Sequence, residues 1–198
     1  MQRRYLYRSI LIVALLVATQ LISIEVAQAH RGHGGPAKVF MTESDAFKTM
    51  LPEGGKILKR KEALKKENHD EAVKRWGYSP AEGVYPYYIS KGKNEELSGA
   101  LFIQSVEYKH GSINLAVGYN KDGHISDIKI LSCQEIYVKE LTEDIQGSGF
   151  LDGFLHLKTD EVITRAKDSD KEPVESMRHV IAKEIGGTAI LLKIFQGL

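Results

Sequence analysis

Four short apolar runs in the middle of the chain constrain its fold more than any other feature. The runs are rich in β-branched and aromatic residues, and glycine-containing turns separate them, which is the pattern of successive β-strands. They are Tyr85–Ile89, Ala100–Val106, Ile113–Tyr119 and Ile125–Leu131. Because short turns join strands that run in opposite directions, the sequence predicts an antiparallel meander.

The connection between the last two runs is the clearest turn in the sequence. It is formed by Asn120-Lys121-Asp122-Gly123, in which Gly123 can adopt the positive φ that closes a hairpin. In the run before this turn, apolar residues fall at every second position from Ile113 to Tyr119. One face of that strand is therefore expected to be buried, and the other is not.

Two helices are predicted before the sheet. The first begins with Ser44 as its N-cap and stops at Pro52. The second is Lys56–Trp76, a highly charged segment in which apolar residues can form one stripe. Its lysines are expected to form the solvated face of that helix.

Two further helices are predicted after the sheet. Phe150–Leu155 indicates a short one, and Pro173 is expected at the first position of a longer one that Gly186-Gly187 ends. The segment that follows, Ala189–Phe195, fits either a last strand or a docked helix. The predicted fold class is therefore α+β, an antiparallel sheet meander flanked by N- and C-terminal helices.

The first 29 residues have the parts of a secretory signal in the correct order. Three arginines precede an apolar core, Ile10–Ala18, and Ala27-Gln28-Ala29 offers the small residues that signal peptidase accepts. We expect cleavage after Ala29 and an extracytoplasmic location, in the periplasm or at the outer face of the cytoplasmic membrane. An uncleaved membrane anchor is the alternative. Residues 30–43 are then a flexible leader, and residues 44–198 form the domain.

Charge and cysteine content exclude several classes of function. Loss of residues 1–29 removes three of the 27 basic and one of the 26 acidic residues, so the remaining net charge is −1. Such a chain has no overall field that would attract nucleic acid. Cys133 is the only cysteine, which excludes an internal disulfide partner, a cysteine-based zinc site, an iron–sulfur cluster and a c-type haem.

Three smaller features each allow two interpretations. Cys133 is a redox thiol or a buried small residue, and no flanking positive charge favours the thiolate. His30 and His33 could chelate Cu(II) at the new N-terminus, or they belong to a polar leader. The tyrosines of Tyr85–Tyr88 beside Trp76 could stack on a flat ligand or form an aromatic cluster on a sheet face.

The hairpin and its flanks resemble the FMN-binding domain family. The run Gly118–Glu135 is similar to the core of that family, which includes the G subunit of the Rnf electron-transport complex and the C subunit of the sodium-pumping NADH:quinone reductase. Glu135 stands at the acidic position that lies beside the flavin in these proteins. The similarity extends more loosely to Ala46–Pro52 and Gly149–Phe154, and it covers about residues 44–185 in all.

This resemblance implies an exported electron-transfer flavoprotein rather than a stand-alone enzyme. Its expected cofactor is FMN, its expected partners are extracytoplasmic or membrane redox proteins, and its expected cofactor-binding residues are Gln134, Glu135, Thr164 and Ser169. No metal site is expected.

One departure from the family concerns the attachment of the flavin. Flavinylated members carry FMN on the threonine of a Ser-Gly-Ala-Thr segment, whereas the corresponding stretch here, Thr164–Pro173, has no Gly-Ala-Thr and includes two aspartates. We therefore expect FMN to be held without a covalent bond. The alternative is a non-redox accessory or binding module that kept the fold and lost the flavin.

Overall fold

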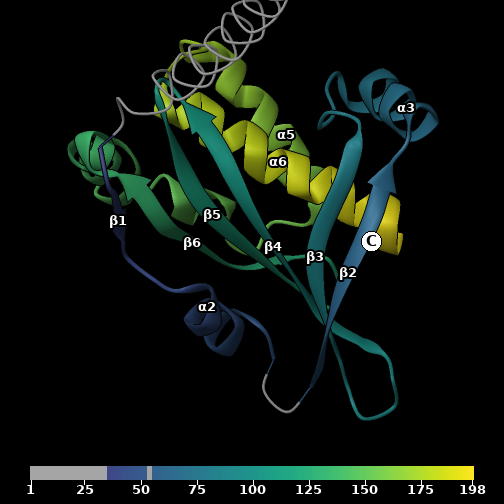
Figure 1. Ribbon diagram of the computed structural model, residues 1–198. Helices are drawn as coiled ribbons and strands as arrows, with labels where there is room; N and C mark the ends of the chain where they lie inside the picture. Colours follow the sequence, from purple (N-terminus) through teal and green to yellow (C-terminus); the bar gives the residue numbers. More distant parts are fainter. Residues whose placement is uncertain (1–34, 53–54) are drawn as a thin grey trace, which may run out of the picture. The chain divides into compact units, whose positions relative to one another are not determined.

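The computed structural model describes residues 35–52 and 55–198. The predicted signal segment, together with His30 and His33, lies outside the described residues. Pro36–Leu198 form one compact unit. This unit has the predicted α+β architecture, a six-stranded antiparallel sheet with helices before and after the meander (Figure 1).

The four predicted strands are all present, and each is longer than its apolar run. In chain order the strands are β1 (Ala37–Val39), β2 (Lys56–Leu64), β3 (Gly83–Lys91), β4 (Leu97–Tyr108), β5 (Gly111–Asn120) and β6 (Ile125–Gln134). Their order across the sheet is β1-β6-β5-β4-β3-β2, so β3 to β6 form the expected meander.

The predicted hairpin turn between β5 and β6 is confirmed. Gly123 has φ 77°, and its N–H donates to the Asn120 carbonyl oxygen at 3.1 Å. The Asn120 side-chain oxygen accepts from the N–H groups of Asp122 and His124, at 3.0 Å each. The turn therefore satisfies its own backbone donors, as an Asx-type turn does.

Helices pack on both faces of the sheet. They are α2 (Glu43–Met50), α3 (Lys66–Trp76), α4 (Val138–Glu140), α5 (Thr159–Asp168) and α6 (Met177–Gln196), and a π-helix, Leu141–Gln146, follows α4. The main core lies between one face and α5 and α6, with α6 crossing behind β4, β3 and β2 in Figure 1. On the other face, Met50 and Leu51 pack against Leu101, Ala116 and Leu131. No described helix is long and apolar enough to cross a membrane.

The prediction of one helix over Lys56–Trp76 is wrong in its first half. Lys56–Leu64 is instead an edge strand that pairs with β3 along its whole length, and only Lys66–Trp76 is helical. A lysine-rich segment is compatible with a solvated helix and with an edge strand, because edge strands also carry charged residues that discourage pairing with other chains. The apolar residues of this stretch, Ile57, Leu58, Ala63 and Leu64, do not alternate, so the sequence carries no period of two that would separate the two solutions.

The folded part starts earlier than the predicted boundary at residue 44. Ala37–Val39, expected in the flexible leader, pair with Ser132–Gln134 as the edge strand β1. Helix α2 then begins at Glu43 rather than after Ser44, because the Thr42 hydroxyl oxygen accepts from the Asp45 N–H at 3.1 Å. Threonine at this position is a standard N-cap, so the cap lies two residues before the predicted one.

The last helix differs from its prediction at both ends. It begins at Met177 with Ser176 as N-cap, not at Pro173, and it continues through Gly186-Gly187 to Gln196. Of the two options for Ala189–Phe195, the helix is therefore correct. The short helix at Phe150–Leu155 is confirmed as the 3-10 helix Leu151–Phe154.

The glycine pair in α6 is explained by packing rather than by helix termination. A side chain at Gly186 would overlap the Tyr78 hydroxyl and place its Cβ 2.5 Å from the Ala166 Cβ, and a Cβ at Gly187 would lie 3.2 Å from Pro80 Cγ. The two glycines therefore form a notch in α6. It receives the linker between α3 and β3.

The aromatic cluster and the cysteine have structural roles. Tyr87 is buried in the core and stacks on Phe102 with ring centroids 5.0 Å apart, whereas Tyr88 lies on the opposite face against Phe47. These tyrosines therefore do not form one stacking platform. Cys133 is buried, and burial raises the pKa of its thiol to about 11.

Candidate functional site

The outer edge of β6 has an open stretch between two paired ends. At one end, beyond the β1 pairing, the Phe40 N–H donates to the Leu131 carbonyl oxygen at 2.8 Å. At the other end, Ile125 exchanges backbone hydrogen bonds with His156 and Leu157 at 2.9 and 3.0 Å. Between them, Asp127–Ile130 pair with β5 on the inner side and with no strand of the described chain on the outer side.

A cavity of about 370 Å³ lies along this open edge. Its volume is within the range of small-molecule sites. The apolar part of its lining includes Met41, Ile130, Ile145, Leu151 and Leu155. Its walls thus come from the segment after β1, from β6 and from the chain between the π-helix and Leu155.

The wall opposite β6 is shaped by irregular helix. The Gly147 N–H donates to the Thr142 carbonyl oxygen at 2.7 Å, which is the i to i+5 bond of a π-helix. Gly149 then turns the chain with φ 67°, and the Asp152 N–H donates back to its carbonyl oxygen at 3.1 Å. This turn directs Leu151 and Asp152 to the cavity.

The charges at the cavity do not favour a strongly anionic ligand. Lys129 is a cation in the lining, and its ammonium already pairs with Asp127 at 2.9 Å. Asp152 adds a second carboxylate. The lining therefore combines apolar side chains with the open backbone edge of β6, and its lysine ammonium is shared with a carboxylate.

Gln134 is the last residue of the β1 pairing and Glu135 follows it, and both lie outside this cavity. The Gln134 side-chain oxygen accepts from the Ser112 N–H at 2.9 Å and from the Ser112 hydroxyl at 3.3 Å. Glu135 is exposed, and its N–H donates to the Pro36 carbonyl oxygen at 3.0 Å. Their described contacts hold the ends of β5, β6 and β1 together.

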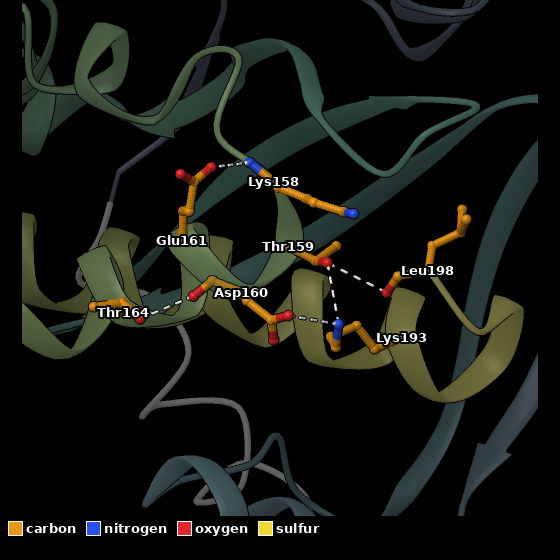
Figure 2. Close-up of polar contacts among 7 residues, drawn as sticks. All are labelled: Lys158, Thr159, Asp160, Glu161, Thr164, Lys193 and Leu198. Atoms are coloured by element: carbon orange, nitrogen blue, oxygen red, sulfur yellow. Dashed lines mark hydrogen bonds and ion pairs between the residues drawn. The ribbon is translucent and has the colours of Figure 1, made fainter.

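Thr164 lies on α5, on a different part of the molecule. Its hydroxyl donates to the Asp160 carbonyl oxygen at 2.9 Å, within the helix (Figure 2). The side chain is exposed beside a surface hollow that Asp160, Glu161 and Asp168 also line. Arg165 also lines this hollow, so three carboxylates and one guanidinium surround the hydroxyl, and the excess of negative charge disfavours a phosphate.

Ser169 is buried at the end of α5. Its hydroxyl donates to the Ala166 carbonyl oxygen at 2.6 Å, and its own carbonyl oxygen lies 2.9 Å from His179 Nδ1. No hydrogen bond or ion pair among the described residues joins Thr164 or Ser169 to Gln134 or Glu135. The structure therefore does not bring the four predicted residues together.

The residues around the β6 cavity were not singled out by sequence reasoning. Asp127 and Lys129 do fall within the hairpin run that resembles FMN-binding domains, and Leu151 falls within the resembling Gly149–Phe154 segment. The resemblance therefore pointed to the segments that line the cavity, but not to the individual residues that line it.

Comparisons with protein-family models, with curated proteins and with solved structures give no match for this chain.

Proposed function

We propose that this chain is an exported electron-transfer module that holds FMN reversibly in the cavity at the outer edge of β6. One observation carries the proposal. Two of the three segments that resemble FMN-binding domains, the β6 hairpin and Gly149–Phe154, meet around one cavity of ligand size. FMN, when bound, supplies reversible electron transfer. The partners of this chain would be redox proteins outside the cytoplasm or in the membrane.

The residues of the cavity have distinct roles in this proposal. Met41, Leu151 and Leu155 bury the ring system, and the backbone groups of Asp127–Ile130 hydrogen-bond its polar edge. Lys129 interacts with the phosphate, and this interaction is weakened because the Lys129 ammonium also pairs with Asp127. Ser169 carries no flavin, since its hydroxyl is buried and already donates to Ala166.

A comparison of FMN with riboflavin tests the proposal directly. Titrating the flavin-free full chain and following flavin fluorescence should give dissociation constants within about threefold of each other, because ring burial dominates. Acid precipitation should release all flavin into the supernatant. Leu151→Glu should abolish binding, and Val174→Glu, which changes a residue that is 72% exposed and outside this cavity, should not.

Two results would contradict the reversible, ring-dominated binding proposed here, and a third would contradict the function itself. Binding of FMN but not riboflavin would show that the phosphate, not the ring, is recognised. Flavin that stays with the denatured chain and disappears in Ser169→Ala would identify Ser169 as an attachment site. The absence of binding at saturating FMN would leave the non-redox binding module as the function of this fold.

A further inference from the structure

A second cavity, of about 380 Å³, lies between α6 and the linker that joins α3 to β3. It is separate from the cavity at β6, since the two share no lining residue. Pro80, Val106, Val174 and Val180 give it mainly aliphatic walls. A small hydrocarbon group is the natural occupant of such walls.

One carboxyl group in this lining has no partner. Glu184 of α6 is partly buried, and within the described residues its side chain forms neither a hydrogen bond nor an ion pair. Burial raises its pKa to about 7. A carboxylate that is partly removed from water and left unpaired lowers stability, so a cation placed beside it would bind favourably.

The neighbouring charged and titratable groups have other partners. Lys183 pairs with Asp170 at 2.7 Å and lies over the Tyr78 ring at 4.3 Å. His179 Nδ1 lies 2.9 Å from the Ser169 carbonyl oxygen, and from β3 the Tyr85 hydroxyl donates to the Ala81 carbonyl oxygen at 2.6 Å. None of these contacts satisfies Glu184.

Two hydroxyl groups at the same place also lack partners. Tyr78 and Ser79 line the cavity, and the hydroxyl oxygens of both are buried without a hydrogen bond in the described part of the chain. Buried polar groups are nearly always satisfied, so a cluster of unsatisfied ones requires an explanation. The Tyr78 hydroxyl is enclosed by the α6 notch at Gly186, so the polar group of this lining that is left for a ligand is the Glu184 carboxyl.

We propose that this cavity binds a small lipophilic primary amine, with the ammonium paired to Glu184 and the hydrocarbon part against Pro80, Val106 and Val180. An ammonium group has three donors, which the carboxylate oxygens of Glu184 can accept. The site is independent of flavin, so failure of one proposal leaves the other intact.

The test uses the full chain and three probes of similar shape, namely benzylamine, benzyl alcohol and benzoate. Titration calorimetry should show benzylamine binding about tenfold or more tightly than benzyl alcohol, with no binding of benzoate. Glu184→Gln should remove this preference for the amine. Glu175→Gln, an exposed glutamate close by in the sequence, is the matched control and should leave binding unchanged.

A pH series separates ion pairing from simple burial of the ring. Affinity for benzylamine should rise between pH 6 and pH 8 as Glu184 loses its proton, while affinity for benzyl alcohol stays constant. The proposal is overturned if benzylamine does not bind, if the alcohol binds equally well, or if Glu184→Gln retains the preference. The melting temperature of Glu184→Gln shows that any loss is not due to unfolding.

Discussion

At the scale of single residues, the notch in α6 gives the most specific prediction. Alanine normally stabilises a helix by about 1 kcal/mol relative to glycine. At Gly186 we expect the opposite, a loss of about 2 kcal/mol, because the new Cβ would overlap the Tyr78 hydroxyl and crowd Ala166. Chemical denaturation measures this loss.

The neighbouring glycine is the control for that experiment. A Cβ at Gly187 would lie 3.2 Å from Pro80 Cγ, a contact that a small shift relieves. Gly187→Ala should therefore change the free energy of unfolding by less than about 1 kcal/mol in either direction. Equal effects of the two variants would mean that the notch does not hold the linker.

A pair of tyrosines tests the unsatisfied hydroxyl at the same place. Tyr78→Phe removes a buried hydroxyl without a partner, so stability should stay the same or rise by up to about 1 kcal/mol. Tyr119→Phe removes a fully buried hydroxyl that lies 2.8 Å from the Thr188 hydroxyl. That change should lower the free energy of unfolding by about 1 kcal/mol. In thermal denaturation, Tyr119→Phe should therefore melt below wild type, and Tyr78→Phe should melt at or above it.

At the scale of elements, the junction of α5 with α6 depends on a buried threonine. The Thr159 hydroxyl donates to the Leu198 carbonyl oxygen at 3.2 Å, and beside it Lys193 pairs with Asp160 at 3.1 Å (Figure 2). Thr159→Val keeps the shape and should lower the free energy of unfolding by about 1 kcal/mol. Thr164→Val, on the exposed side of α5, should have a smaller effect.

Elements with a strict period of two could be predicted from the sequence, and elements shaped by tertiary contacts could not. The strand Ile113–Tyr119 and its turn were correct because alternation and Gly123 each have one common solution. Lys56–Leu64 was not, since an exposed edge strand and a solvated helix both accept lysine. Gly186-Gly187 looked like a helix end because its partner, Tyr78, is distant in sequence.

The candidate site was even harder to predict from the sequence than the helices. Its cavity combines Met41, Lys129 and Leu151, which lie far apart in the chain and have no spacing that a motif could describe. A resemblance can mark a segment. It does not say which residues of that segment face one another.

At the scale of the whole folded unit, Glu184 makes stability depend on pH. Its pKa is raised from 4.5 to about 7, so between these values the folded state keeps a proton that the unfolded state has lost. The free energy of unfolding should therefore fall as pH rises from about 4.5 to about 7. Glu184→Gln should remove this pH dependence, so the stability of the variant relative to wild type should increase by about 3 kcal/mol between pH 4 and pH 8. Parallel stability curves would argue against a desolvated Glu184.

The ladder between β3 and β4 is short. These strands pair only over Tyr88–Lys91, whereas β3 pairs with β2 and β4 with β5 along nearly their full lengths, and Figure 1 shows β3 and β4 diverging. Side chains add to this connection: Tyr87 stacks on Phe102 of β4 with ring centroids 5.0 Å apart, and from α6 the Gln196 side chain donates to the Tyr87 hydroxyl and Phe195 stacks on the Tyr87 ring at 5.6 Å.

From the short β3–β4 ladder we expect β2, α3 and β3 to open together, as one cooperative unit, while the rest of the sheet stays intact. Amide protons in the β2–β3 ladder should then exchange with solvent at a lower opening free energy than those in the β4–β5 ladder. Gln196→Ala should accelerate exchange in the first ladder and leave the second unchanged. Native-state hydrogen exchange would follow both ladders in a single experiment.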